Sequence, residues 1–342
     1  MKIKKIDLLY SDPVEDGWRP SFCRIYTDTG LYGDGEVALS YGAVSYAAFA
    51  EMHDLAPLLI GMNPLEHEVI WEKLYRQSFF GLNAGPVIFG AISAFDIALW
   101  DIKGKYYHAP LHELLGGEQQ RRVRAYASQL QMGWGVGRHH AGQPADYAAN
   151  TRIAVEKGFD AVKINFLTFD EEGQPVNHID QENLLTSDYL NLVQRRLHAV
   201  RQVLGPNGDL ILENHALTGK LAAIRFGKLA KQYSPLYYEE PVKPDPQLLA
   251  TVHHETGLPI ASGERLYSRW DFKRAFDQGA IQVAQPDIGT AGGVTEVKKI
   301  CDLAAISDIG VQIHITGSNL MTAVSLNLEA TLPNFEIGRA HV

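Results

Sequence analysis

The chain has 342 residues and a net charge of −9, with 46% hydrophobic and 21% charged residues, as in an ordinary globular enzyme. This acidic balance, without a block of Lys and Arg, excludes the usual nucleic-acid-binding surfaces, and the sequence has no apolar stretch of membrane-spanning length. Its two cysteines, Cys23 and Cys301, are far apart and not in a metal-ligand spacing, which favours a reducing compartment. The N-terminus is too polar for a signal peptide, so we expect a cytoplasmic protein.

The first third of the sequence predicts a small α+β domain, at residues 1–120. The runs "KIKKIDLLYS" and "SFCRIYTDTGLYGDGEVAL", with a Gly-rich turn at Gly30–Gly35, are typical of an antiparallel meander. Helical apolar spacing then follows in "SYAAFAEMHDLAPLLIG", "PLEHEVIWEKLYRQS" and "AISAFDIALWDIKGKYY".

Residues 121–342 show a different pattern, in which short apolar runs alternate with helical stretches. The runs are at 123–128, 161–166, 209–214, 236–241, 259–264, 283–287 and 310–315, with an eighth near Phe335. The helical stretches between them are at 147–158, 190–205, 219–233, 246–257, 268–279 and 294–310. Eight strand–helix units predict a (β/α)₈-type barrel, with a doubly wound sheet as the alternative. We expect the last unit to be incomplete, as in a C-terminally truncated barrel.

Three glutamates end three consecutive predicted strands. They are Glu213, Glu239 and Glu264, separated by 26 and 25 residues, which is one strand–helix unit each time. Because the carboxyl ends of barrel strands meet at one mouth, these carboxylates are expected to converge, and three close anions need a cation. Oxygen ligands without cysteine favour Mg²⁺ over Mn²⁺ or Ca²⁺. The alternative is that each glutamate is a solvated loop residue.

Other polar residues follow neighbouring predicted strands. His314 and Asp287 suggest a general base whose tautomer is fixed by a carboxylate, although a buried, hydrogen-bonded histidine is the alternative. Lys163 is a candidate for binding a substrate carboxylate or enolate, and Asn165 shares its face of the strand. Trp18 and Arg19 in the first domain are further candidate substrate-binding residues.

Several of these stretches resemble the enolase superfamily, in its mandelate-racemase-like branch, over nearly the whole chain. They are "AISAFDIALWDIKGKYYHAPLHELLGG", "EEP", "SGERLYSRWDFKRAF" and "QPDIGTAGGVTE". The resemblance implies that an N-terminal capping domain precedes the barrel. It also implies that Glu213, Glu239 and Glu264 hold Mg²⁺. His314, paired with Asp287, would then remove the proton α to a carboxylate.

The pattern Lys163-Ile-Asn165, together with His215 two residues after Glu213, is similar to galactonate dehydratases. That likeness implies that His215 protonates the departing 3-hydroxyl and that a galactonate-like acid sugar becomes a 2-keto-3-deoxy acid. The alternatives are a racemase or epimerase of the same superfamily, or a catalytically silent ligand-binding relative. Because Asn165 cannot accept a proton, a two-base racemase is disfavoured. A homo-oligomer is expected.

Two positions depart from the family's pattern. Glu213 stands where the family usually has Asp, and Arg339 lies near the place of a glutamate that ends the eighth strand. The segment Ile337–Val342 can be encoded by DNA that resembles sequencing-adapter read-through, so we expect these residues not to be native. Substrate choice is expected to lie in the loops Pro13–Arg19 and Tyr41–Ser45 and in the insert Thr168–Asp188.

Overall fold

The computed structural model describes residues 1–13, 17–83, 85–134, 139–177 and 184–340. The chain forms two compact units, and both are discontinuous in sequence. The first unit comprises Met1–Val123, Gly263–Lys273 and Ala284–Glu336, and the second comprises Arg124–Ser262, Arg274–Val283 and Ile337–Val342. The predicted boundary between domains at 1–120 and 121–342 stays a prediction.

The first unit contains a three-stranded antiparallel sheet, which confirms the predicted meander. Its strands are β1 (Ile3–Tyr10), β2 (Ser21–Thr27) and β3 (Tyr32–Val37), in the order β1-β2-β3. Residues along β2 alternate between buried and half-buried, because successive side chains of a strand point to opposite faces. One face of this sheet is therefore the core face.

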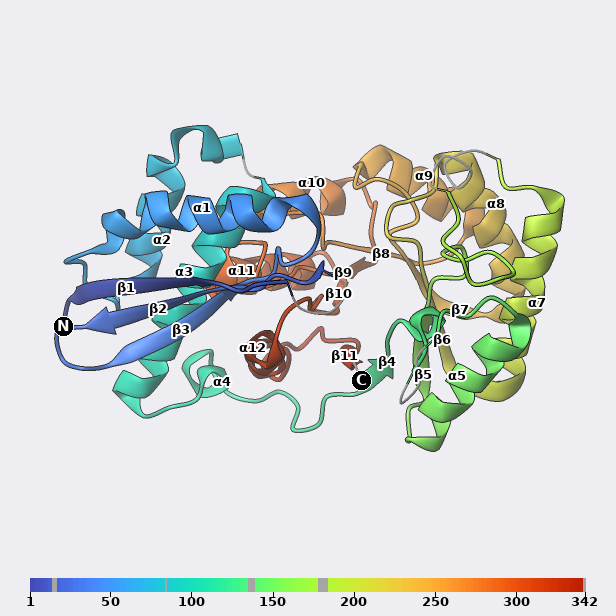
Figure 1. Cartoon of the computed structure of the whole chain (residues 1–342), viewed down its shortest axis with the longest axis horizontal. Helices are drawn as coiled ribbons and strands as arrows, with labels where there is room; N and C mark the ends of the chain where they lie inside the picture. The colour runs from blue at the N-terminus through green and yellow to red at the C-terminus, as the bar shows by residue number, and fades with distance from the viewer. Residues whose placement is uncertain (14–16, 84, 135–138, 178–183, 341–342) are drawn as a thin grey trace. The chain divides into compact units, whose positions relative to one another are not determined.

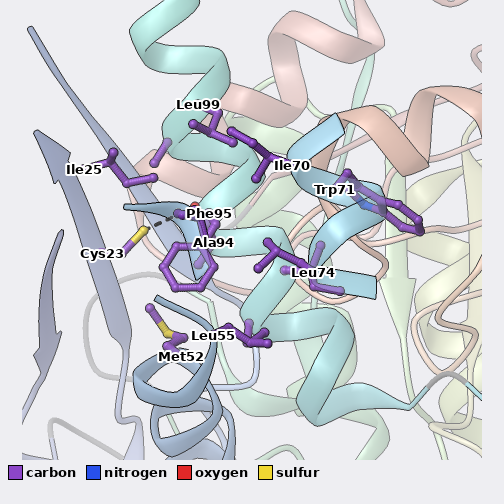
Figure 2. Close-up of a cluster of buried hydrophobic side chains, with 14 of the residues drawn as sticks. Cys23, Ile25, Met52, Leu55, Ile70, Trp71, Leu74, Ala94, Phe95 and Leu99 are labelled. Atoms are coloured by element: carbon purple, nitrogen blue, oxygen red, sulfur yellow. Dashed lines mark hydrogen bonds between the residues drawn. The ribbon is translucent and has the colours of Figure 1, made fainter. Parts of the chain in front are cut away.

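Three helices provide the other side of this core: α1 (Ser45–Leu55), α2 (His67–Gln77) and α3 (Pro86–Tyr107) (Figure 1). Cys23 and Ile25 point from the sheet toward Ala94 and Phe95 of α3 (Figure 2), and the Cys23 thiol donates to the Ala94 carbonyl at 3.3 Å. A β-carbon at Gly35 of β3 would overlap that same carbonyl oxygen. Glycine there allows the close approach of β3 to α3.

The first unit also contains segments that follow α3 in the sequence. They include α4 (Leu111–Leu114), β10 (Gly310–Val311), α11 (Gly293–Ile306) and α12 (Asn319–Glu329). Asp96 of α3 accepts the backbone N–H of Thr295 at 2.9 Å and so caps the first turn of α11. Helix α12 was missed by the sequence prediction, since its sequence NLMTAVSLNLE interrupts the apolar residues with Asn, Thr and Ser, which favour caps and turns.

The described residues of the second unit form the strands β4 (Ala125–Ala127), β5 (Ala161–Ile164), β6 (Asp209–Glu213), β7 (Pro235–Glu239), β8 (Ile260–Ser262) and β11 (Gly338–Ala340). Its helices are α5 (Pro144–Glu156), α7 (Ser187–Leu204), α8 (Lys220–Ala230) and α9 (Pro246–Thr256). The strands enclose a buried core made of Tyr126, Ala161, Ile211, Tyr237, Ala261, Val283 and Ile337.

Strand β9 (Val283–Ala284) and helix α10 (Arg269–Asp277) each contain residues of both units. The eight-stranded sheet has the order β10-β9-β8-β7-β6-β5-β4-β11, and its strands alternate with helices along the chain. This parallel sheet, together with the antiparallel sheet of the capping part, confirms the predicted (β/α)₈-type fold. The eighth strand begins at Gly338, three residues after the predicted position. In the described ranges, no helix is long and apolar enough to cross a membrane.

Candidate functional site

His314 and Asp287, the predicted base and its partner, lie side by side in the first unit. The two residues form a parallel β-bridge, and His314 Nδ1 is 2.7 Å from Asp287 Oδ2. The other carboxylate oxygen, Oδ1, accepts the backbone N–H of Gly289 at 2.7 Å. Because both carboxylate oxygens are hydrogen-bonded, the Asp287 side chain has a fixed direction, and so has the imidazole that contacts it.

Glu264, one of the predicted metal ligands, is also in the first unit and contacts the second nitrogen of the same imidazole. Its Oε2 lies 3.0 Å from His314 Nε2. Burial alone would lower the pKa of His314, but the charges of Glu264 and Asp287, and their hydrogen bonds, raise it to about 9. The two flanking carboxylates therefore favour the doubly protonated imidazole.

The second unit holds the other two predicted metal ligands, Glu213 and Glu239, on neighbouring strands. These residues are register partners at the ends of β6 and β7. The Lys163 ammonium lies 2.6 Å from Oε1 of each, and all three side chains are buried. Burial would lower the pKa of Lys163, but the two carboxylates raise it. Lysine thus supplies the positive charge that two close carboxylates require.

His215, the predicted acid, follows β6 and is half-buried. Its backbone is left-handed, with φ of 50°, and Ala216 follows with φ of 57°. Its Nε2 is 3.3 Å from Glu213 Oε1, and its Nδ1 is 3.4 Å from the amide nitrogen of Asn165. Burial raises the pKa of Glu213, but His215 and Lys163 lower it well below its usual value. Left-handed non-glycine residues are costly and often mark functional sites.

Gln129 belongs to this cluster and was missed by sequence reasoning. Its side-chain amide donates to Glu213 Oε2 at 2.5 Å and lies 3.3 Å from His215 Nε2. Gln131 donates in turn to Gln129 and accepts the backbone N–H of Asn165 at 3.2 Å. Gln129 follows β4 by two residues, so a search of the end of the first barrel strand would have found it.

Trp18 and Arg19 lie in the first unit, between β1 and β2. Trp18 is half-buried and Arg19 is exposed, and the Arg19 backbone N–H donates to the Ser40 carbonyl at 2.7 Å. Their loop includes residues 14–16, and the insert Thr168–Asp188 includes residues 178–183, which lie outside the described residues, as do the last two residues of Ile337–Val342. The roles of these segments stay predictions.

The predicted metal triad is divided between the two units. No group of three or more His, Cys, Asp and Glu side chains is arranged around one metal position among the residues that the structure describes. The donors themselves fit a hard cation, since Glu213 and Glu239 offer only oxygen and are adjacent in register. The Mg²⁺ assignment therefore stays a prediction.

Comparison with known proteins gives two family matches. Residues 146–342 match the enolase C-terminal domain-like family, and residues 19–116 match the N-terminal domain of the mandelate racemase / muconate lactonizing enzyme family. A D-galactonate dehydratase from Ralstonia pickettii (strain 12J) is 32% identical over 309 residues, which are 90% of this chain and 74% of that protein.

Solved structures agree with these matches. A protein from Zymomonas mobilis ZM4, assigned as a dehydratase, is 42% identical with a TM-score of 0.97. A member of the enolase superfamily from Salmonella Typhimurium is 41% identical, also with a TM-score of 0.97. In both comparisons the match covers 99% of this chain and 87% of the other. The chain belongs to the enolase superfamily, with the N-terminal domain of the mandelate racemase / muconate lactonizing enzyme family.

Proposed function

We propose that this protein catalyses the Mg²⁺-dependent dehydration of an acid sugar, a galactonate-like aldonate, to a 2-keto-3-deoxy acid. The observation that carries the proposal is the His314–Asp287 pair, with 2.7 Å between Nδ1 and Oδ2. The similarity to a D-galactonate dehydratase supports the choice of substrate class. A cytoplasmic location and a homo-oligomeric state belong to the same proposal.

His314 is the base in this mechanism. Asp287 accepts a hydrogen bond from Nδ1–H of His314. Nε2 is therefore the nitrogen that receives the proton from C2 of the substrate. Glu264 now contacts Nε2 at 3.0 Å and favours the protonated ring. If Glu264 held a cation, its charge would favour the protonated ring less, and His314 would release its proton more easily.

Glu213, Glu239 and Glu264 would hold the Mg²⁺, which would supply positive charge to stabilise the negative charge that develops on the substrate carboxylate. The donor set fits this role, although Lys163 now neutralises two of the three carboxylates. Lys163 would keep a fixed positive charge beside the ligands throughout the reaction. Glu213, which is longer than the aspartate usual in the family, still presents its carboxylate next to Glu239.

His215 is the acid in this mechanism. It gives its proton to the 3-hydroxyl, the C3–O bond breaks, and water leaves. The resulting enol then becomes the ketone of the product. The partners of His215 suit this role, because Glu213 stabilises the charged imidazole, whereas Asn165 and Gln129 orient it. The variant His215→Asn is expected to keep exchange of the C2 proton with solvent but to lose elimination of water.

The racemase or epimerase alternative needs a second base, and the side chain beside His215 is the amide of Asn165, which cannot accept a proton. A panel of acid sugars incubated with Mg²⁺ separates the possibilities. Formation of a keto acid, detected with semicarbazide, supports the dehydratase. Exchange of the C2 proton in D₂O without keto acid would show a racemase or epimerase. Binding without any turnover would show a silent relative.

A further inference from the structure

A buried carboxylate of the antiparallel sheet, Glu36 of β3, contacts the segment that follows His314. Glu36 is 0% exposed. Its Oε1 accepts the backbone N–H of Ser318 at 2.9 Å, and its Oε2 accepts the Ser318 hydroxyl at 2.5 Å. Both oxygens of one carboxylate therefore hold one residue, four positions after the base, and all of these residues belong to the first unit.

The backbone of this segment is shaped for that contact. Gly317 has φ of 151°, and a β-carbon there would lie 3.1 Å from Glu36 Oε1 and would collide with the Met321 side chain. Ser318 is also the N-cap of α12, since its hydroxyl oxygen accepts the N–H of Leu320 at 3.2 Å. The left-handed glycine and the cap fix the path of the chain between His314 and α12.

Ala38, two positions after Glu36, contacts the segment that follows Asp287. The Ala38 backbone N–H donates to the Gly289 carbonyl at 3.1 Å, and Gly289 N–H donates to Asp287 Oδ1 at 2.7 Å. A β-carbon at Gly289 would lie 2.5 Å from that of Ala38. The end of β3 thus contacts the segment after Asp287 as well as the segment after His314.

We propose that Glu36 is a positioning residue for the His314–Asp287 pair, and that it acts by holding Ser318 through both of its carboxylate oxygens. A serine N-cap needs no carboxylate behind it, and a buried carboxylate costs free energy. Burial raises the pKa of Glu36 to about 7, against the two hydrogen bonds from Ser318. A group this costly, placed behind the base, fits a role in positioning. This inference rests on the proposed function for the reaction in which His314 takes part.

The test uses the full chain and four variants: Glu36→Gln, Ser318→Ala, Ser318→Thr and, as a matched control, Glu329→Gln. Glu329 is another buried glutamate of the first unit, on α12. We expect kcat to fall about 10- to 100-fold in Glu36→Gln and Ser318→Ala, with KM within about twofold. Ser318→Thr keeps both donors and should restore most of kcat, and Glu329→Gln should keep the wild-type value.

Two further readouts do not need turnover. Hydrogen–deuterium exchange of the segment 312–320 should increase in Glu36→Gln, and the ¹⁵N resonances of the His314 imidazole should move, whereas the control should change neither. If no acid sugar is turned over, the proposed function fails, but these readouts still decide the role of Glu36. Folded Glu36→Gln with wild-type kcat, exchange and imidazole resonances would overturn the inference. So would an equal loss of kcat in the Glu329→Gln control.

Discussion

The two units each place one basic nitrogen group between two carboxylates, but the groups differ in kind. In the second unit the Lys163 ammonium lies 2.6 Å from Glu213 and from Glu239. In the first unit the His314 imidazole lies between Asp287 and Glu264. Lysine among carboxylates stays charged at every physiological pH. An imidazole has an ordinary pKa nearest neutrality and can exchange its proton more easily, although Asp287 and Glu264 raise the pKa of His314 to about 9. The lysine cluster is therefore suited to binding charge and the histidine cluster to moving a proton.

A carboxyl group outside these two clusters, Glu329, lies beside no lysine or histidine in the part of the chain that the structure describes. Glu329 of α12 is buried, and neither of its oxygens has a hydrogen-bond partner in the part of the chain that the structure describes. Burial raises its pKa to about 8. The protonated, neutral form of this carboxyl group is therefore favoured at pH 7. Lysine, histidine and protonation are thus three ways to reduce the cost of a buried negative charge.

The largest expected effect comes from removing the group that exchanges a proton. His314→Asn keeps a donor for Asp287 but no basic nitrogen, and the rate of dehydration should fall by about 10³- to 10⁴-fold. The fold should be retained, since Asn occupies part of the same volume. The keto-acid assay and circular dichroism measure these outcomes. His198→Asn, exposed on α7, is the control. Full activity in His314→Asn would refute its role as base.

The next largest effect is expected on the unfolding free energy when the positive charge of Lys163 is removed. Lys163→Met would remove the ammonium that contacts both buried carboxylates, Glu213 and Glu239, and removing one partner of a buried ion pair costs about 3–5 kcal/mol of unfolding free energy. Urea denaturation measures this loss, and exposed Lys220→Met is the control. Mg²⁺ should restore part of the stability of Lys163→Met, because a cation that binds only the folded state stabilises it. Unchanged stability would mean that these carboxylates do not depend on Lys163.

Two adjacent glutamates at the end of β7 test which carboxylate binds the metal. Glu239 contacts Lys163, whereas Glu240 is the next residue, with left-handed φ of 42°, and its backbone is bonded to Ala261 and Ala216. Glu239→Gln should weaken Mg²⁺ binding by about 10²-fold or more, because a formal charge is lost from the ligand set. Glu240→Gln should reduce stability and leave Mg²⁺ affinity within a few-fold. Calorimetric titration distinguishes them, and equal losses of affinity would contradict the assignment.

The smallest effect at neutral pH is expected at Glu329. Its pKa is higher in the folded state than its usual value of 4.5, so the folded state binds more protons between about pH 4.5 and 8. The unfolding free energy of the wild type should therefore fall as pH rises through that window, by about 1 kcal/mol per pH unit. Glu329→Gln should reduce this slope and leave dehydration unchanged. Equal slopes in the two proteins would show that Glu329 does not keep its proton.

The sequence was sufficient for features that repeat along the chain. Glu213 and Glu239 could be identified because one strand–helix unit separates them and places both at strand ends. Features that depend on contacts between distant segments could not be identified from the sequence. In the sequence, Glu36 is only a polar residue of a Gly-rich strand, and no pattern indicates its contact with Ser318, which is 282 residues away. Gln129, which follows β4 and contacts Glu213, was not predicted from the sequence.

The wide sequence separation within the first unit has a consequence for synthesis on the ribosome. The Trp71 side chain donates to the Gly292 carbonyl, and these residues are 221 positions apart in the sequence. Glu36 and its partner Ser318 are 282 positions apart. At translation rates of about 5–20 residues per second, the Glu36 contact cannot form until roughly 15–55 s after that residue is made. The lysine cluster, within residues 163–239, needs a much shorter stretch of chain. We infer that nascent chains complete the lysine cluster first and position the histidine pair last.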